Sequence, residues 1–241
     1  MDDKIQGVVL QSIRYGDTSL IVKVFTREYG LRSYMVKGAF NRGASNRAAL
    51  FQNLHFIQYV EVGKPNTSSL RYLKDVQLSM VYQSIPLVMN KSAILMYVSE
   101  LLSKTLTEEA QNTNLYDFIL RSIQWLDLVE EGYANFPLYF TLELTRQLGF
   151  YPKANHQAGW CFDMMEGSFV HDYPLHPYYL DATYAALLSS LLDLGIDETC
   201  HRALTVQQRR AMLDCLIAFI RLHAPVMNDF HSHEVLQTVL Q

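Results

Sequence analysis

The fold is decided by a nine-residue stretch of alternating character, TSLIVKVFT, at residues 18–26. β-Branched and aromatic residues dominate it, as is typical of strands. Successive side chains of a strand point to opposite faces, which places Leu20, Val22 and Val24 on one face and Ser19, Ile21, Lys23 and Phe25 on the other. The stretch therefore predicts a β-strand with these two faces.

Four neighbouring runs repeat this texture, at residues 5–14, 31–38, 54–62 and 70–79. Turn signals separate them, among them Tyr15-Gly16-Asp17 and Gly63-Lys64-Pro65-Asn66. Five short strands within eighty residues predict a small closed barrel, because closing the sheet removes the exposed edges that antiparallel strands otherwise present.

From about Ile85 onward the hydrophobic period changes from two to about 3.6, which predicts helices. The first carries a stripe of Ile94, Tyr97, Val98, Leu101 and Leu102. A second spans residues 115–126 with Thr113 or Asn114 as its cap. A third starts near Asn135, with Pro137 in its first turn and Gly149 just past its end. Each stripe buries one face, so we expect a helical bundle.

Two further helices are expected later in the chain. One runs from about Asp181 to Leu194, and the other begins with a capping-box pattern at Thr205 and Gln208. Residues 151–179 are of another kind, because they hold three prolines, three histidines and one cysteine. We therefore predict an α+β chain: a five-stranded barrel at residues 1–80, then an all-α domain at residues 81–241 with an irregular insert at residues 151–179.

The composition is that of a folded chain, since 49% of the 241 residues are hydrophobic and 18% are charged. No apolar run approaches the ~20 residues that a membrane span needs, so we expect no membrane segment. The start, Met-Asp-Asp-Lys, lacks the apolar core of a secretion signal. Three cysteines cannot all pair within one chain. These features favour a cytoplasmic protein.

The net charge of −4 conceals two opposite halves. Residues 1–80 contain eleven Lys and Arg against six Asp and Glu, a net +5, whereas residues 81–241 contain nine against eighteen, a net −9. A basic half beside an acidic one is a cue for nucleic-acid contact by the basic half.

Cationic and aromatic side chains interleave in the basic half, which is the pattern of small barrels that bind single-stranded nucleic acid. The loop at residues 38–47 is its sharpest feature, because no acid occurs between Leu31 and Val60 and glycines let the backbone approach a phosphate. The candidate DNA-binding residues are Arg14, Lys23, Arg27, Arg32, Lys37, Arg42, Arg47, Arg71 and Lys74, with Tyr34 and Phe40 as stacking platforms.

Metal chemistry has two candidate clusters. Cys161, His156, His171 and His176 are zinc-ligand types within the insert, but they lack a paired ligand spacing. The expectation is an insert packed by its aromatics, with no cofactor and no enzymatic activity. Near the C-terminus, the cluster of Asp229, His231, His233 and Glu234 is interpreted as a polar helix start with Ser232 as its cap. A metal-dependent hydrolase built on these four residues stays open as an alternative.

Several short motifs, in order along the chain, resemble the bacterial RecO family of recombination mediators. They are Gly7-Val8-Val9-Leu10, Tyr15-Gly16-Asp17-Thr18-Ser19, the FTREYGL run at residues 25–31, Val36-Lys37-Gly38-Ala39, the YVSELL run at residues 97–102, and the segment 140–152 ending in Leu-Gly-Phe-Tyr-Pro. The resemblance implies an OB-fold barrel followed by a helical domain. Many members carry two Cys-x-x-Cys pairs after the last motif, whereas this chain keeps only Cys161 and has Met164 at the partner position. The insert is therefore expected to be a degenerate zinc finger.

The resemblance also implies a function in DNA repair at the nucleoid. Such a protein binds single- and double-stranded DNA, anneals complementary strands, and helps load recombinase onto strands covered by single-strand-binding protein. RecR and the acidic, apolar C-terminal tail of single-strand-binding protein are the implied partners. A protein-only adaptor, which docks repair partners without touching DNA, is the alternative.

Overall fold

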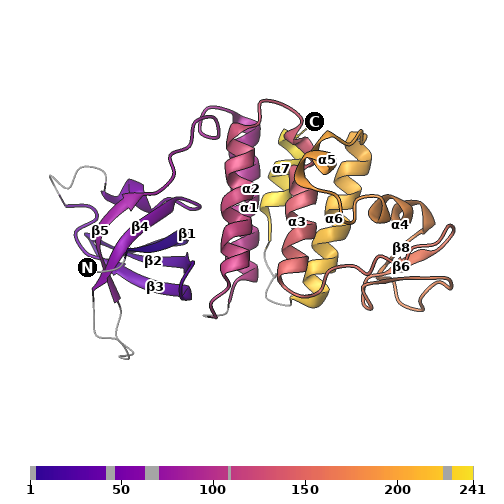
Figure 1. Ribbon diagram of the computed structural model, residues 1–241, viewed down its shortest axis with the longest axis horizontal. Coiled ribbons are helices and arrows are strands. Elements are labelled where there is room, and N and C mark those ends of the chain that lie inside the picture. Colours follow the sequence, from indigo (N-terminus) through magenta and orange to yellow (C-terminus); the bar gives the residue numbers. More distant parts are fainter. Residues whose placement is uncertain (1–3, 42–46, 63–70, 108–109, 225–229, 241) are drawn as a thin grey trace.

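The computed structural model describes residues 4–41, 47–62, 71–107, 110–224 and 230–240. Strands gather at one end of the molecule and helices fill the rest, with a small second sheet at the far end (Figure 1). Within the described residues, no helix is both long and apolar enough to cross a membrane.

The N-terminal part is a closed five-stranded barrel. Its strands are β1 (Ile5–Tyr15), β2 (Ser19–Thr26), β3 (Gly30–Val36), β4 (Phe56–Val62) and β5 (Arg71–Leu78), with the 3-10 helix η1 (Arg47–Phe51) between β3 and β4. The order around the barrel is β1-β2-β3-β5-β4, and β4 pairs with β1 to close it. Among the described strands of the barrel, β3 and β5 pair in parallel and the other pairings are antiparallel. This is the OB-fold arrangement, so the predicted barrel is confirmed.

Alternation along β2 has the predicted orientation. Leu20, Val22 and Val24 lie inside the barrel in a core shared with Val9 and Ile57. The opposite side of the strand is not uniformly exposed, because Phe25 is buried as well. It belongs to a second core that the barrel shares with the helices.

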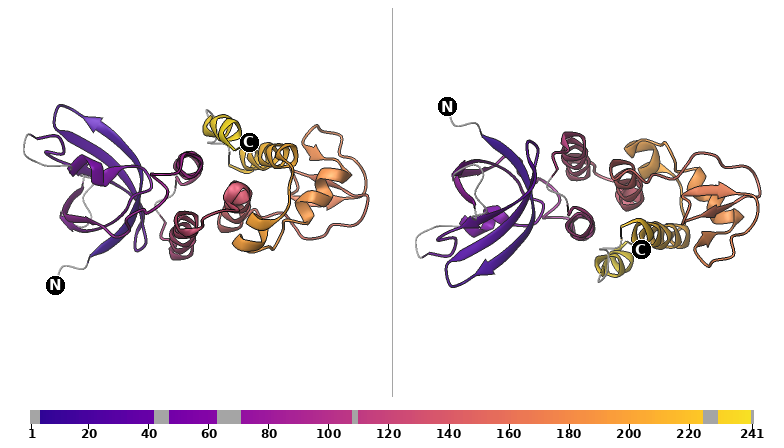
Figure 2. Two further views of the ribbon diagram at one scale, coloured as in Figure 1. Left: turned by 90° about the horizontal axis from the view of Figure 1, so that it is seen from above. Right: turned by 90° about the horizontal axis from the view of Figure 1, so that it is seen from below.

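The barrel packs on the helices through a row of outward-facing apolar residues, here called the docked row. Cross-strand register places Phe56, Val8, Phe25 and Leu31 side by side on β4, β1, β2 and β3. Tyr116 packs between two of them, with its ring centroid 6.5 Å from that of Phe25 and 6.2 Å from that of Phe56. Figure 2 shows the first two helices end-on, directly against the barrel.

The helical part contains α1 (Met89–Thr105), α2 (Thr113–Leu128), η2 (Tyr133–Asn135), α3 (Phe136–Gln147), α4 (Ala182–Ser189), α5 (Ile196–His201), α6 (Val206–His223) and α7 (Ser232–Val239). The predicted stripe of α1 is buried. Pro137 stands at the start of α3, Gly149 follows its end with φ +88°, and Thr205 and Gln208 form the capping box of α6. These expectations are confirmed.

Three helix boundaries differ from prediction. Asn112, rather than Thr113 or Asn114, caps α2 by accepting the N–H of Leu115 at 2.9 Å. The helix after Asp181 ends at Ser189, because the chain turns through Asp193 with φ +60° and then forms α5, which lacks a long hydrophobic stripe. His231, rather than Ser232, precedes the first turn of α7.

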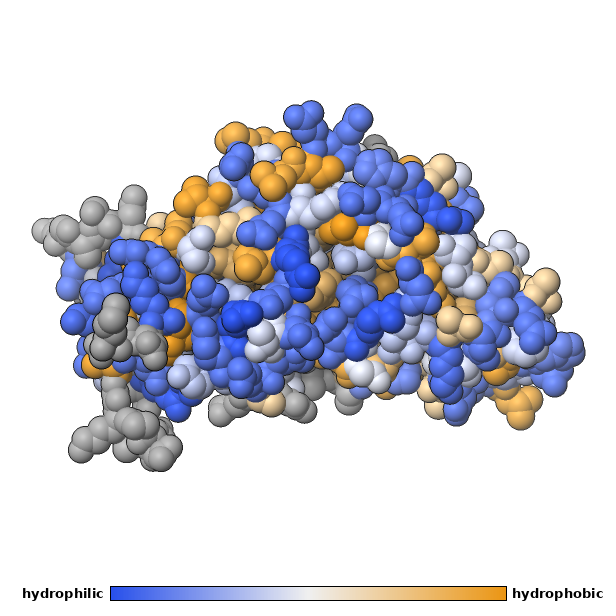
Figure 3. All heavy atoms as spheres, viewed as in Figure 1, coloured by the Kyte–Doolittle hydropathy of each residue, from blue (hydrophilic) through white to orange (hydrophobic). Residues whose placement is uncertain are grey.

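The connection between barrel and helices is fixed by two buried charges. The Asp127 carboxylate accepts the backbone N–H groups of Gln83, Ser84 and Ile85 at 2.8–2.9 Å. The Lys91 ammonium donates to Ser84 Oγ at 2.7 Å. Four apolar side chains around this junction stay exposed, namely Val81, Leu87, Met89 and Leu128. Hydrophobic residues, coloured orange, also gather along the upper edge of the view in Figure 3.

The insert is more regular than predicted. It holds a three-stranded sheet in the order β7-β6-β8, built from β6 (Cys161–Asp163), β7 (Ser168–Val170) and β8 (Tyr179–Leu180). Phe162 and Phe169 are buried, and Phe162 packs edge-on against Phe219 of α6 with ring centroids 5.7 Å apart. Aromatic packing therefore anchors the sheet to the bundle, as expected. The strands themselves were not predicted, because two or three residues are too few to show an alternating pattern.

Candidate nucleic-acid interface

The outer surface of the barrel carries a second apolar row, which no helix covers in the part of the chain that the structure describes. Register places Ile13 beside Ile21, Ile21 beside Met35, Met35 beside Tyr72, and Tyr72 beside Val62. The row thus crosses all five strands, and directly paired side chains point to the same side. Ile13, Tyr72 and Val62 are 49%, 37% and 46% exposed, respectively. We call these five residues the exposed row.

Lysines flank the exposed row on both sides. Lys23 lies two residues beyond Ile21, so it faces outward, and its pairing with Ser33 places it on one side of the row. Lys37 lies two residues beyond Met35 on the other side, with its Nζ 4.8 Å from the Tyr72 ring centroid. Lys74 follows Tyr72 at the same spacing. All three lysines are exposed, and Lys74 lies 3.9 Å from the exposed carboxylate of Asp75.

A second group of predicted residues meets at the adjoining end of the barrel. Arg14 stacks over the exposed ring of Phe40, with Cζ 5.1 Å from its centroid, and donates to the Asp17 carbonyl at 3.1 Å. Arg47 reaches the same end, where its Nη1 donates to the Lys37 carbonyl at 3.4 Å. Arg42 lies outside the described residues. The structure thus brings cations and an aromatic platform together beside the exposed row.

Tyr34 is a correction. Its side chain lies fully buried inside the barrel, where its hydroxyl receives a hydrogen bond from Tyr59 at 2.7 Å and donates to Glu61 at 2.9 Å. Burial raises the pKa of the Tyr34 phenol, so it stays a neutral donor. No base can stack on this ring, and the prediction of Tyr34 as a platform is wrong.

Three predicted arginines lie against acids, and two of them share one carboxylate. Arg32 pairs with Glu61 at 2.8 Å, and Arg71 lies 3.7 Å from the same carboxylate. Arg27 makes a two-pronged contact with Asp117 of α2 at 2.9 and 3.1 Å, which lowers the pKa of that carboxyl. Arg27 therefore ties the barrel to the helical domain. These three residues contribute less positive field than their number in the sequence suggests.

The zinc candidates of the insert do not converge. Cys161 Sγ lies near backbone carbonyls, His171 pairs with the adjacent Asp172, and His176 Nε2 approaches Asp163 at 3.4 Å. Among the described residues, no three His, Cys, Asp or Glu side chains are placed to hold one metal ion. This covers His231, His233 and Glu234 on α7, while Asp229 lies outside the described part of the chain.

None of the five members of the exposed row is among the DNA-binding residues predicted from the sequence. Apolar residues stand on both faces of β2, so the pattern does not tell a solvent-facing isoleucine from one against a helix. Only the cross-strand register aligns these residues into one surface, and register is set by turns and a bulge between Val9 and Gln11.

The fold and this surface define a class: an OB-fold protein with a C-terminal helical domain, whose barrel presents apolar and cationic side chains to solvent. Comparison with known proteins narrows the class. Residues 1–82 match the family model described as Recombination protein O N terminal, and residues 87–228 match that described as Recombination protein O C terminal. The chain belongs to the RecO family.

Relatives agree along nearly the whole chain. A protein of Phocaeicola vulgatus named DNA repair protein RecO is 33% identical over 241 residues, which is 98% of each chain. Proteins of the same name from Bacteroides fragilis and Flavobacterium psychrophilum are each 34% identical, over 98% and 99% of each chain, respectively.

Proposed function

We propose that this chain is a recombination mediator in DNA repair that binds single-stranded DNA across the exposed row of its barrel. The observation that carries the proposal is the pairing of an uncovered apolar row with lysines on both sides. Bases stack on aromatic and apolar side chains, whereas ammonium groups release counterions from the phosphates. The role is one of binding: the protein anneals strands and helps load recombinase, with no reaction of its own.

The charge distribution supports this orientation. The barrel half carries +5 and the helical half −9, so a polyanion is drawn to the barrel and repelled by the helices. The docked row is buried against the helices, whereas the exposed row lies four residues away from it along β2 and β3, outside that contact. Duplex DNA meets the same cations through its phosphates, and nucleoid association is the location that such binding implies.

Fluorescence anisotropy with a labelled oligo-dT strand over a salt series tests the proposal. We expect the triple variant Lys23→Gln, Lys37→Gln, Lys74→Gln to bind more weakly at low salt. We also expect its plot of log K against log salt to be shallower by about 0.7 for each phosphate that the variant no longer neutralises. The matched control is Lys153→Gln, an exposed lysine of the insert. An unchanged slope in the triple variant moves the DNA site elsewhere.

The alternative, a protein-only adaptor, gives a different result in the same experiment. The unmodified protein then shows no salt-dependent affinity for the strand, while it still retains RecR in a pull-down. RecR is the partner that the family resemblance implies, and the pull-down is made with the full chain in both cases.

For the acidic, apolar tail of single-strand-binding protein we propose the groove between α2 and α3. This groove has a volume of about 580 Å³, and Phe118, Trp125 and Tyr139 line it together with Arg121 at its rim. Apolar rings suit the tail's apolar end and an exposed guanidinium suits its acids. We expect Arg121→Glu to weaken binding of a labelled tail peptide at least tenfold. Arg202→Glu, away from the groove, is the control.

A further inference from the structure

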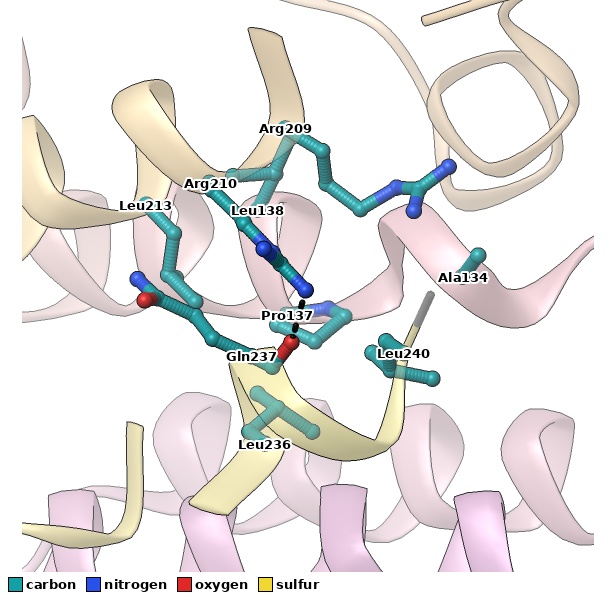
Figure 4. Close-up of a pocket in the computed structure, with 9 residues that line it drawn as sticks. All are labelled: Ala134, Pro137, Leu138, Arg209, Arg210, Leu213, Leu236, Gln237 and Leu240. Carbon is teal, nitrogen blue, oxygen red and sulfur yellow. Dashed lines mark hydrogen bonds between the residues drawn. The ribbon is translucent and has the colours of Figure 1, made fainter. Parts of the chain in front are cut away.

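Helix α7 lies in a groove formed by α1, α3 and α6. Its residues Ser232, Leu236 and Leu240, spaced four apart, are buried, and the two leucines are only 1% and 7% exposed. Figure 4 shows both leucines beside Pro137 of α3 and below Leu213 of α6. The seat is therefore an apolar groove filled by one face of an amphipathic helix.

The groove has a basic wall. Arg210 points toward α7 and its Nη2 donates to the Gln237 carbonyl at 2.5 Å (Figure 4). Its Nε is buried and has no hydrogen-bond partner within the described residues. Arg209 stands beside it and is held by Asn135 Oδ1 at 2.9 Å. The guanidinium of Arg210 therefore keeps a donor that α7 does not satisfy.

The segment of α7 is held by a ring contact, with the centroids of Tyr97 and Phe230 5.6 Å apart, and by a small set of polar contacts. The Glu100 carboxylate of α1 accepts the backbone N–H groups of His231 at 3.2 Å and Ser232 at 2.7 Å, and no side chain of the segment itself caps the helix. Gln237 Nε2 donates to Asp214 at 2.6 Å. An eight-residue helix does not form on its own in water, so α7 is helical only while it is docked. The buried side chains of Phe230, Leu236 and Leu240 must offset the ordering of the whole segment, so we expect α7 to be less stable than the longer helices.

The position of α7 in the chain also sets it apart from the bundle. The match to the C-terminal family model ends at residue 228, so α7 lies beyond the part of the chain that this model describes. Helices α1, α3 and α6 share a core that contains Tyr97, Leu138 and Leu216, and the C-terminal segment adds Phe230, Leu236 and Leu240 to its edge. Helix α7 thus covers the bundle from outside.

We propose that α7 is a displaceable intramolecular ligand of this groove, and that an amphipathic helix of a partner protein takes its place. The partner helix would present two apolar side chains four residues apart to the groove. It would also present an acceptor, a carbonyl or a carboxylate, to Arg210. Binding of the partner is then controlled by the opening of α7, because both compete for one seat.

The test uses the full chain and a labelled peptide of residues 230–240 as the probe. Leu236→Asp places a charge in the apolar groove and frees it of α7, whereas Val235→Asp changes an exposed neighbour on the same helix. We expect the peptide to bind the Leu236→Asp variant at least tenfold more tightly than the unmodified protein or the Val235→Asp control. Equal binding by all three, with circular dichroism showing that they are folded, overturns the proposal.

Hydrogen exchange on the unmodified protein gives a second test that needs no substitution. We expect the amides of α7 to exchange at least tenfold faster than those of α1 and α6, because α7 opens without the bundle unfolding. Equal protection of the three helices means that α7 is an integral part of the core, and that result overturns the proposal as well. Neither measurement involves DNA, so its failure is separate from failure of the DNA-binding proposal.

Discussion

Glu61 accepts the hydrogen bonds that hold a buried tyrosine and a partly buried arginine of the barrel. Its carboxylate receives Tyr34 at 2.9 Å and Arg32 at 2.8 Å, and Tyr59 completes the chain through Tyr34. We expect Glu61→Leu to destabilise the protein by about 1–3 kcal/mol or more, since it leaves a partly buried guanidinium and a buried phenol without their acceptor. Urea unfolding measures the change. Gln58→Leu, on the outer side of the same strand, is the control and should stay within about 0.5 kcal/mol.

Tyr72 is the aromatic member of the exposed row. We expect Tyr72→Ala to weaken single-stranded DNA binding by about 1–3 kcal/mol, the value of one base–aromatic stack, while the salt slope stays unchanged because no charge is removed. Anisotropy titrations measure both quantities. Tyr178→Ala, which removes an exposed tyrosine of the insert, serves as the control. If instead the salt slope becomes shallower and the salt-independent part of the binding free energy stays unchanged, Tyr72 acts by positioning Lys37 and not by stacking on a base.

At the scale of single elements, hydrophobic period was sufficient to predict the five strands and most of the helices. Alternation located β2 to within one residue, and capping chemistry located α6. These local patterns could not predict the features that depend on partners distant in sequence. The first turn of α7 is capped by Glu100, more than a hundred residues earlier, and no local pattern in the His231–Glu234 cluster reveals that acceptor. The exposed row is hidden for the same reason, because it exists only across strands.

The cap on α7 makes its docking sensitive to acid. Burial raises the pKa of Glu100, but hydrogen bonds from Ser232 and His231 and the charge of Lys104 outweigh it, so the pKa lies below the usual 4.5. A depressed carboxyl pKa adds stability that is present above its unfolded value and is lost as the pH falls through the folded value. We therefore expect α7 amides to lose protection below about pH 4.5, before those of α1 do.

Glu100→Gln separates this carboxyl from the other ionisable groups near α7, which include Asp214, His231, His233 and Glu234. The amide cannot ionise, so the variant should show weak protection of α7 at neutral pH and little further change in acid. Hydrogen exchange at pH 7 and pH 4 measures this. If the variant keeps the acid-induced loss of protection, another group is responsible for it.

At the scale of the whole molecule, the barrel carries two parallel apolar rows, of which one is buried by the helices and the other is exposed. The docked row joins barrel and helices into one core, whereas the exposed row is left for a ligand. Phe25 and Ile21 make this contrast testable, because they stand on the same outer side of β2, four residues apart, with one in each row. The two tryptophans of the chain, Trp125 and Trp160, both lie in the helical part and report on its unfolding.

We expect Phe25→Ala to destabilise the helical part by about 3–5 kcal/mol, as measured by tryptophan fluorescence in urea, because it opens a cavity against Tyr116. Ile21→Ala should leave that transition within about 0.5 kcal/mol and weaken DNA binding instead. If Phe25→Ala alters only the barrel, seen as a change in tyrosine signal with unmoved tryptophan fluorescence, the halves unfold independently. The docked row is then a contact between two separate domains. A shared transition means that the bundle sets the stability of the surface that meets DNA, so that disturbing the helices also disturbs strand binding.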